Sequence, residues 1–389
     1  MPNLPRFRSV ADLLGVDRPS DPVHCIRPAI IEAAARTLLR EFPGAVAYAV
    51  KANPLPIVLE TLFQAGVRHF DTASPAEIRL VRGMFGDQAT LYYNNPAKSR
   101  DAIREAYGVG VRRFSADCAA EIDKIRDVLP ADEAVVIAVR MMTPPGTAVF
   151  NLSRKFGADP ADVPALLKRV RDHGFKPALC FHVGSQCVEP AMFDRAFQLT
   201  NRVIEEAGVA LDHLNVGGGF PTAYAGEKVP PLRAFIRAIK LGRPDLPLVC
   251  EPGRALVAEG NSVLTQVTLR KANALYINDG VFGSFMEIPY GKDRLMLPAR
   301  PIRPGKGFRS RTKSYTIYGP TCDGNDVLPY QVRLPEDMRE GDYIEFDRIG
   351  AYGICMATTF NGFTPSAVVV IEDADAVELP TPMVMAEVA

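Results

Sequence analysis

The chain has 389 residues, more than one hydrophobic core usually spans, so its length predicts one large domain with a smaller one beside it. Its 45 basic and 45 acidic residues cancel, and its apolar runs are strand-sized, so neither nucleic acid nor a membrane is expected as a partner. Seven scattered cysteines without a CxxC pair, and an N-terminus without a secretory pattern, indicate reduced thiols in a cytoplasmic protein.

Helix-like and strand-like segments alternate over the first two thirds of the chain. After a helix expected at 28–41, strand-like runs occur at 45–51, 69–74, 90–95, 112–117, 134–141, 178–185, 213–219 and 247–253. Helical stretches separate them at 54–66, 76–86, 98–109, 119–129, 161–173, 190–208 and 230–242. Near-continuous apolar strands with helices between them indicate a parallel sheet covered on both faces. Eight such units predict a (β/α)8 barrel, with an open doubly wound sheet as the alternative.

Polar residues recur where these expected strands end. They are Lys51, Asp71, Asn95, Asp117, Arg140, His182 and Glu251. Barrel enzymes build their active sites at the carboxyl ends of the strands, so this pattern predicts an active site at that end of the barrel.

Beyond about residue 256 the helices disappear from the pattern. Strand-like runs at 263–269, 274–278, 315–318, 343–346 and 367–371 are separated by turn-forming stretches, notably 300–307. We expect an antiparallel β-domain made of residues 1–25 and 256–389, with the barrel occupying residues 26–255.

Several groups at the expected barrel mouth suit one cofactor. Lys51 offers the amine that Schiff-base chemistry needs, although a solvated lysine would look the same. The glycine run in 215–221 (NVGGGFP) lets backbone amides approach a phosphate, although such runs also form plain turns. Arg254 can bind a phosphate or simply pair with Glu251, and His182 adds an imidazole. An amine, a phosphate cradle, an acid and a ring on one face are the equipment for pyridoxal phosphate (PLP).

Seven motifs in chain order resemble the ornithine decarboxylase family of fold-type III PLP enzymes. They are YAVKAN, FDTAS, FHVGSQ, NVGGGFP, CEPGR, YGPTCDGNDVL and GAY…FNGF, and the resemblance runs from about residue 24 to residue 371. It implies an alanine-racemase-like barrel and β-domain, PLP as cofactor, and decarboxylation of a basic L-amino acid, ornithine before lysine, in polyamine biosynthesis. It also implies a homodimer, because each active site in this family is built from two subunits.

The resemblance assigns roles by position. Lys51 matches the lysine that carries the cofactor, His182 the imidazole that stacks on its ring, and Glu251 the acid beside its pyridine nitrogen. Cys322 and Asp323 match residues supplied across the dimer interface, where the cysteine protonates the decarboxylated carbon and the aspartate meets the distal amine. Other matched positions are the cofactor contacts Asp71, Arg140, Ser185, Gly217, Gly218, Gly219, Arg254 and Tyr352, and an interface pair, Lys155 and Asp326.

One departure from the family pattern leaves the substrate open. The family's second aspartate for the distal amine follows a tyrosine, whereas here Tyr290 is followed by Gly291. Glu287 or Asp293 replaces that acid if the loop is shifted; otherwise both are solvated loop charges. With Glu287 and Tyr290 as substrate-binding candidates, the substrate is ornithine, lysine, arginine or a modified diamino acid.

The residues also bear on three other interpretations. An alanine-racemase-like enzyme would lack an acid opposite the pyridine nitrogen, so Glu251 argues against it. A diaminopimelate decarboxylase would need cations for a distal carboxylate, for which Lys292 and Arg294 are candidates. A non-catalytic, antizyme-inhibitor-like regulator should show damage at the lysine, the glycines or Cys322, and none is visible. The five histidines do not cluster, so no metal site is expected.

Overall fold

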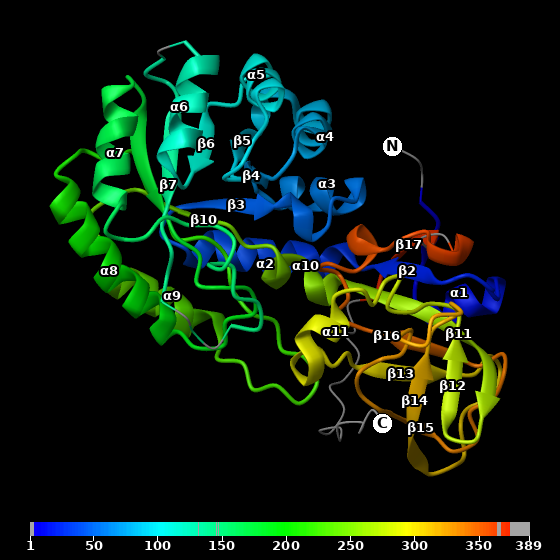
Figure 1. Ribbon diagram of the computed structural model, residues 1–389. Coiled ribbons are helices and arrows are strands. Elements are labelled where there is room, and N and C mark those ends of the chain that lie inside the picture. Colours follow the sequence, from blue (N-terminus) through cyan, green and yellow to red (C-terminus); the bar gives the residue numbers. More distant parts are fainter. Residues whose placement is uncertain (1–3, 131, 145, 147, 364–366, 374–389) are drawn as a thin grey trace.

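Residues 4–373, apart from 131, 145, 147 and 364–366, are described by a computed structural model. In Figure 1 a barrel wrapped by helices lies beside a smaller domain of strands. None of the described helices combines the length and apolar character that a bilayer crossing requires.

Eight parallel strands close into a barrel. Each strand pairs with the next one along the chain, and β10 closes the ring on β3 by placing Cys250 beside Val46. The strands are β3 Ala45–Ala49, β4 His69–Thr72, β5 Thr90–Tyr93, β6 Arg113–Ala116, β7 Val136–Arg140, β8 Lys176–Cys180, β9 Leu214–Asn215 and β10 Leu248–Cys250. The predicted (β/α)8 barrel is confirmed, and the open sheet is excluded.

Helices cover the outside of the barrel. They are α2 Pro28–Glu41, α3 Pro56–Ala65, α4 Pro75–Phe85, α5 Arg100–Gly108, α6 Ala119–Val128, α7 Val163–Asp172, α8 Ala191–Ala207 and α9 Leu232–Gly242. Proline stands in the first turn of α2, α3 and α4, where its missing N–H costs no helical hydrogen bond. Helix α2 turns Ile31, Ala35 and Leu38 into the barrel core. A large apolar side chain buried in this way contributes roughly 1.5–3 kcal/mol.

The sixth barrel strand ends earlier than its apolar run predicts. The run 178–185 predicts a strand to its end, whereas β8 stops at Cys180. Gly184 and Gln186 have φ angles of 99° and 55°, in the left-handed region that strands do not use. His182 therefore projects from a loop above the barrel rather than from the barrel wall.

The second domain is a sheet that uses both ends of the described chain. Strands β1 (Arg6–Phe7) and β2 (Val23–Ile26) join it from the N-terminal side, with helix α1 (Val10–Val16) between them. The later strands are β11 Asn261–Lys271, β12 Ala274–Ile277, β13 Ala299–Ile302, β14 Thr312–Tyr318, β15 Val332–Pro335, β16 Tyr343–Phe346 and β17 Ala367–Ile371. Short helical segments are α10 Arg254–Val257, α11 Ile288–Gly291, η1 Val50–Ala52, η2 Gly86–Gln88, η3 Ala258–Gly260, η4 Lys292–Leu295, η5 Ile354–Met356 and η6 Phe360–Gly362.

This sheet differs from the prediction in three details. It is mixed rather than antiparallel, because β12 pairs in parallel with β14, and β17 pairs in parallel with β1 and β2. The stretch 300–307 was expected to be a turn, yet β13 extends to Ile302 and pairs antiparallel with β16. The prolines in this stretch favoured a turn, but a proline such as Pro301 is tolerated in an edge strand, and β13 is an edge strand. Strand β15 has no counterpart among the expected strands, and the expected β-domain beyond residue 373 lies outside the described residues.

Candidate active site

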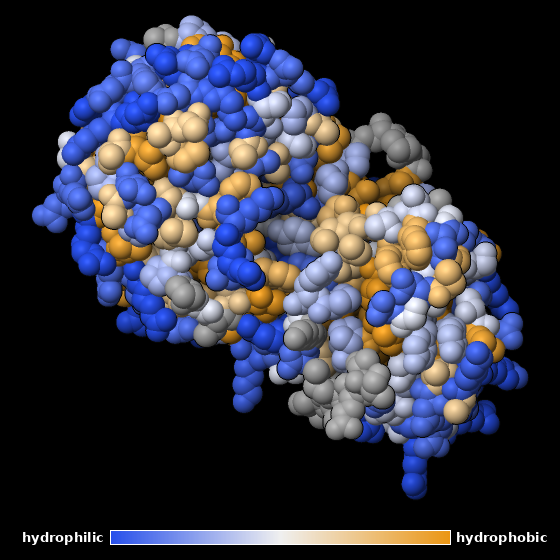
Figure 2. Space-filling model, viewed as in Figure 1, coloured by the Kyte–Doolittle hydropathy of each residue, from blue (hydrophilic) through white to orange (hydrophobic). Residues whose placement is uncertain are grey.

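A cavity of about 370 Å³ opens at the carboxyl ends of the barrel strands. In the view of Figure 2 the surface is hollowed where the two domains meet. Six of the seven strand-end residues singled out from the sequence line this cavity: Lys51, Asp71, Asn95, Arg140, His182 and Glu251. Asp117 is not among the lining residues, and its carboxylate accepts a hydrogen bond from the Gly157 amide, 2.9 Å away.

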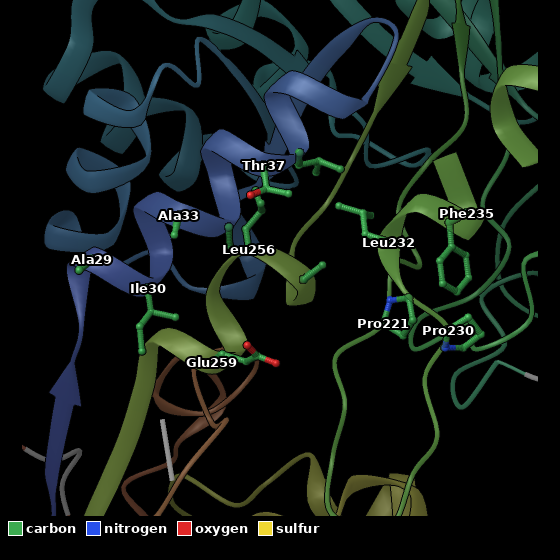
Figure 3. A pocket seen from close by; sticks show the side chains of 13 residues that line it. Ala29, Ile30, Ala33, Thr37, Pro221, Pro230, Leu232, Phe235, Leu256 and Glu259 are labelled. Atoms are coloured by element: carbon green, nitrogen blue, oxygen red, sulfur yellow. The ribbon is translucent and has the colours of Figure 1, made fainter. Parts of the chain in front are cut away.

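A second cavity, of about 490 Å³, lies between helices α2 and α9 and the segment after β10 (Figure 3). Its wall is mainly apolar, with Ile30 and Leu256 on one side and Leu232 and Phe235 on the other. Among the lining residues that the structure describes, Glu259 is the single ionisable one. Its described lining residues include no lysine, cysteine or histidine and no glycine turn, so the candidate active site is the one at the barrel mouth.

Lys51 lies in η1, directly after β3, with its amine in the barrel-mouth cavity. Its Nζ donates to Oδ2 of Asp71 at 2.8 Å. Asp71 is only 1% exposed, and its Oδ1 has no hydrogen-bond partner among the described residues. Burial disfavours the charge on Lys51, but the neighbouring Asp71, Tyr352 and Glu251 favour it and together outweigh burial, so the pKa of Lys51 is raised. The amine is therefore a cation in the ligand-free protein and must release a proton before it can attack an electrophile.

Glu251 follows β10 and is held by two asparagine side chains. Its Oε1 accepts hydrogen bonds from Nδ2 of Asn94, at 2.5 Å, and from Nδ2 of Asn215. Burial raises the pKa of Glu251 to about 7 and Asp71 adds to the rise, while Lys51 opposes it. The two amides fix the carboxyl group in one orientation, and its pKa lets it exchange a proton near neutral pH.

We expect Glu251 to make the ligand-free protein less stable as the pH rises from about 4.5, the carboxyl's unperturbed pKa, to about 7. The folded chain holds the proton more tightly than the unfolded chain, so this contribution is complete at lower pH and is lost as the carboxyl ionises. The change should be roughly 3 kcal/mol in the free energy of unfolding. Urea unfolding at pH 5 and pH 8 should show the loss in the wild type and a smaller loss in Glu251→Gln. Equal losses in both proteins would assign the effect to another group.

His182 presents a neutral ring at the cavity. Its Nδ1 accepts a hydrogen bond from the Gly184 amide at 2.9 Å, so this nitrogen carries no proton. Burial, followed by the charges of Arg140 and Lys51, lowers the pKa of His182 to about 3. An uncharged flat ring can lie against the face of an aromatic ligand.

Three glycines form a closely packed turn after β9. Gly217 and Gly219 have φ angles of 67° and 96°. A Cβ atom on Gly217 would lie 2.4 Å from the carbonyl oxygen of Phe181, and one on Gly218 would lie 2.4 Å from that of Glu251. The turn therefore requires glycine, and a side-chain-free turn lets an anion approach the backbone amides.

Arg254 faces the same end of the cavity. Its Nη2 donates to Oγ of Ser185 at 3.4 Å, and its guanidinium carbon lies 5.1 Å from the ring centre of Tyr352. Its Nε is buried and has no hydrogen-bond partner in the described part of the chain. A phosphate group placed here would find the unpartnered Nε–H of Arg254, the Ser185 hydroxyl and a glycine turn.

The residues at the barrel mouth fit PLP. The unpartnered Nε of Arg254 and the glycine turn offer donors to a phosphate, and the neutral ring of His182 can stack on a pyridine. Glu251 offers an acid to a ring nitrogen, and Lys51 offers an amine to an aldehyde. The described residues contain no group of histidine, cysteine and acidic side chains that could hold a metal ion.

The four residues expected to meet the substrate, Cys322, Asp323, Glu287 and Tyr290, are not among the lining residues of this cavity. Cys322 is exposed, and neither it nor Asp323 lines the cavity of its own chain. Tyr290 on α11 is 65% exposed. Glu287 is buried in an ion pair with Arg254, so its carboxylate is already occupied. Of the expected interface pair, Lys155 lines the cavity, whereas Asp326 is buried and accepts hydrogen bonds from its own chain, at Val281 and Thr321.

Some residues of the site were missed from the sequence. Asn94 and Asn215 hold Glu251, and the signal for them was their place at the ends of two strands. Arg154 and Phe156, on a loop that lines the cavity, gave no sequence signal, since the loop lies between elements.

Comparison with known proteins points to one family. Residues 29–258 match the family described as pyridoxal-dependent decarboxylase, pyridoxal binding domain, and residues 256–350 match its C-terminal sheet domain. The lysine/ornithine decarboxylase of Selenomonas ruminantium is 35% identical over 357 residues, which cover 88% of each protein. The ornithine decarboxylase of Panagrellus redivivus is 33% identical over 359 residues, covering 84% of this chain and 79% of the relative. The structure of the Paramecium bursaria Chlorella virus arginine decarboxylase bound to agmatine has a TM-score of 0.82 at 27% identity, covering 93% of this chain and 99% of that one.

Proposed function

Because the chain belongs to the pyridoxal-dependent decarboxylase family, and is a PLP-dependent decarboxylase of basic amino acids, we propose that it converts L-ornithine, or next L-lysine, to the corresponding diamine. The observation that carries this proposal is the amine of Lys51, paired with Asp71 and facing Glu251, inside a cavity that fits PLP. Its place in polyamine biosynthesis and its cytoplasmic location belong to the same proposal. The seven cysteines, all free thiols, support that location.

The proposed residue roles begin with holding the cofactor. Lys51 would bind PLP covalently through Nζ, while Gly217, Gly218, Gly219, Ser185, Arg254 and Tyr352 would hold its phosphate. Asp71 and Arg140 would line the cofactor, and His182 would stack on its ring. When bound, PLP supplies an electron sink for the electron pair left on the substrate carbon as CO2 departs.

Glu251 would keep a proton at the pyridine nitrogen. A carboxylate close to that nitrogen favours its protonated, positively charged form, and that charge strengthens the electron sink. Asn94 and Asn215 serve this role by fixing the carboxyl group, since both donate to the same oxygen and leave the other free to face the ring.

The proposed active site is completed by a second subunit. Cys322 and Asp323 lie outside the cavity of their own chain, which supports a homodimer in which each chain supplies them to the other. Cys322 of the partner subunit would give a proton to the carbon that has lost CO2. Asp323 of the partner subunit would meet the distal amine of the substrate.

The missing second acid has a structural reason. A Cβ atom on Gly291 would lie 2.2 Å from Cγ of Leu295, so an aspartate there requires the buried Leu295 side chain to move. Asp293 in η4 is exposed. With one acid for the distal amine, supplied by the partner, chain length is selected by the depth of the cavity rather than by a pair of carboxylates.

The alternative of a diaminopimelate decarboxylase finds less support. It needs free cations where the distal carboxylate would lie, but Arg294 pairs with Glu227 at 3.1 Å. The side chain of Lys292 lies outside the described residues. Arginine remains an alternative substrate, since an arginine decarboxylase shares this fold.

The test combines a spectrum with a substrate panel. The purified protein should absorb near 420 nm, about where protein-bound PLP absorbs, and should release CO2 from L-ornithine fastest and from L-lysine next. Values of kcat/KM for L-arginine and meso-diaminopimelate should be at least about tenfold lower, the scale of one methylene or one mismatched polar group. A yellow protein with another preferred substrate would refute the ornithine proposal. A colourless protein without CO2 release would refute the catalytic one.

A further inference from the structure

A buried ion pair joins the sheet domain to the phosphate end of the cavity. Glu287, which follows β12 and precedes α11, binds Arg254, the first residue of α10, through both carboxylate oxygens. One of the two contacts, from Nη1 to Oε2, is 2.9 Å long. Arg254 is 3% exposed and Glu287 is 8% exposed, so the pair is shielded from solvent and from salt screening.

The partners of Arg254 leave one of its N–H donors without an acceptor in the described part of the chain. Nη1 also donates to the hydroxyl of Tyr224 at 2.7 Å, and Nη2 reaches Ser185. Glu287 therefore occupies the fork of terminal nitrogens, while Nε has no partner in the described part of the chain. A planar guanidinium held at its fork has a fixed orientation, and its remaining N–H then has a fixed direction.

The same contacts remove Glu287 from the substrate. Both of its oxygens are taken by a buried arginine, and Glu287 does not line the cavity. A substrate ammonium would have to displace a bidentate guanidinium, the better partner for a carboxylate. This arrangement gives no support to the expectation that Glu287 replaces the missing acid for the distal amine.

We propose that Glu287 is a positioning residue that holds Arg254 toward the cofactor phosphate and thereby sets the affinity of the chain for PLP. The inference rests on the proposed function, because the group that Arg254 meets is the phosphate of PLP. Glu287 belongs to the sheet domain and Arg254 to the barrel side. The inference therefore makes cofactor binding depend on the contact between the two domains.

Glu287 has two opposite effects on PLP binding, and the larger one decides whether its removal raises or lowers the dissociation constant. Its negative charge repels a phosphate, so removal of the charge alone would tighten PLP binding. Removal of the ion pair leaves the buried Arg254 without the partner that orients it, and this weakens PLP binding. Loss of a partner that orients a ligand-binding side chain costs about 10–100-fold in affinity at metal sites, and we expect orientation to dominate here as well.

The experiment measures PLP binding before turnover. The dissociation constant of PLP is obtained by titrating the cofactor-free protein for the wild type, Glu287→Gln and Glu287→Asp, and the 31P resonance of the bound phosphate is recorded. Glu259→Gln is the matched control, because Glu259 is 46% exposed and pairs with Arg348 at 3.2 Å outside the cavity. The dissociation constant should rise about tenfold or more in Glu287→Gln and less in Glu287→Asp, with a shifted 31P resonance and an unchanged substrate KM at saturating PLP.

Several outcomes separate this inference from its rivals. An unchanged dissociation constant with a raised substrate KM would make Glu287 a substrate residue, and tighter PLP binding would make it only a repulsive charge. If Glu287→Gln does not fold, Glu287→Asp still tests the orienting role, because it keeps the charge and shortens the reach: weaker PLP binding would support the inference, and an unchanged dissociation constant would overturn it. A wild-type protein that does not bind PLP at all would overturn the proposed function, whereas normal wild-type binding with no change in either variant overturns this inference alone.

Discussion

Lys51→Ala should remove the absorbance near 420 nm and lower the rate of diamine formation by at least about 10³-fold, the scale of losing a residue that forms a covalent bond in catalysis. The loss should be this large because the amine of Lys51 lies at the barrel mouth, where it donates to Asp71 at 2.8 Å and shares the cavity with Glu251. The other lysine among the described lining residues, Lys155, lies on the loop at 151–156 rather than on a strand end. The measurements are an absorbance spectrum in the presence of excess PLP and single-turnover diamine formation.

The control for Lys51→Ala is Lys176→Ala. Lys176 opens β8 at the opposite, amino-terminal end of the barrel and is exposed, so its removal should leave the spectrum and the rate unchanged. PLP should still associate with Lys51→Ala without a covalent bond, because the glycine turn, Ser185 and Arg254 remain. A Lys51→Ala protein that stays yellow and keeps its turnover would refute the role proposed for the amine.

The barrel was predictable because its signals are local. Each barrel helix has a proline, serine or acidic residue near its start, and each buried strand is a short apolar run, so neither depends on distant partners. The sheet domain was less predictable because its strands are defined by what they pair with. The segment Val332–Pro335 becomes β15 only because β14 lies beside it. Likewise, the parallel pairing of β12 with β14 depends on a long connection that no short pattern reveals.

The candidate site divides along the same line. Residues that lie at strand ends or in glycine turns could be proposed from the sequence, because the barrel brings every strand end to one mouth. The partner of Arg254 could not, since Glu287 is 33 positions away and belongs to the other domain. From the sequence the loop around Glu287 carried several charges without an assigned partner. Only the folded chain shows that one of them, Glu287, forms a buried ion pair with Arg254.

The pKa values of the site explain why a neutral imidazole and a charged amine occur in the same cavity. Burial moves His182 and Glu251 in opposite senses, lowering the pKa of the imidazole to about 3 and raising that of the carboxyl to about 7. Both shifts disfavour charge, whereas Lys51 keeps its charge because Asp71 is beside it. Near neutral pH the cavity therefore combines a neutral ring, a carboxyl that is ready to exchange a proton, and a cationic amine.

Mixing two nearly inactive variants, Lys51→Ala and Cys322→Ala, should restore diamine formation to about a quarter of the wild-type rate. In a symmetric dimer with shared sites, one site of the mixed dimer carries both substitutions and the other carries neither. Random exchange of equal amounts makes about half of the dimers mixed, and each mixed dimer has one intact site of two. The position of Cys322 outside the cavity of its own chain is the structural reason to expect this.

A matched mixture tests whether recovery comes from sharing rather than from stabilisation by a partner. Lys51→Ala mixed with Glu251→Gln should recover nothing, because both residues belong to the same barrel and every site in the mixed dimer then keeps one defect. Mass spectrometry of the mixtures must show that subunits have exchanged. Exchange without recovery in the Lys51→Ala and Cys322→Ala mixture would mean that each chain builds its site alone, and Cys322 would lose its proposed role. If activity recovers with Lys51→Ala and Cys322→Ala but not with Lys51→Ala and Glu251→Gln, then the barrel of one chain and the Cys322 loop of the other form a single active site.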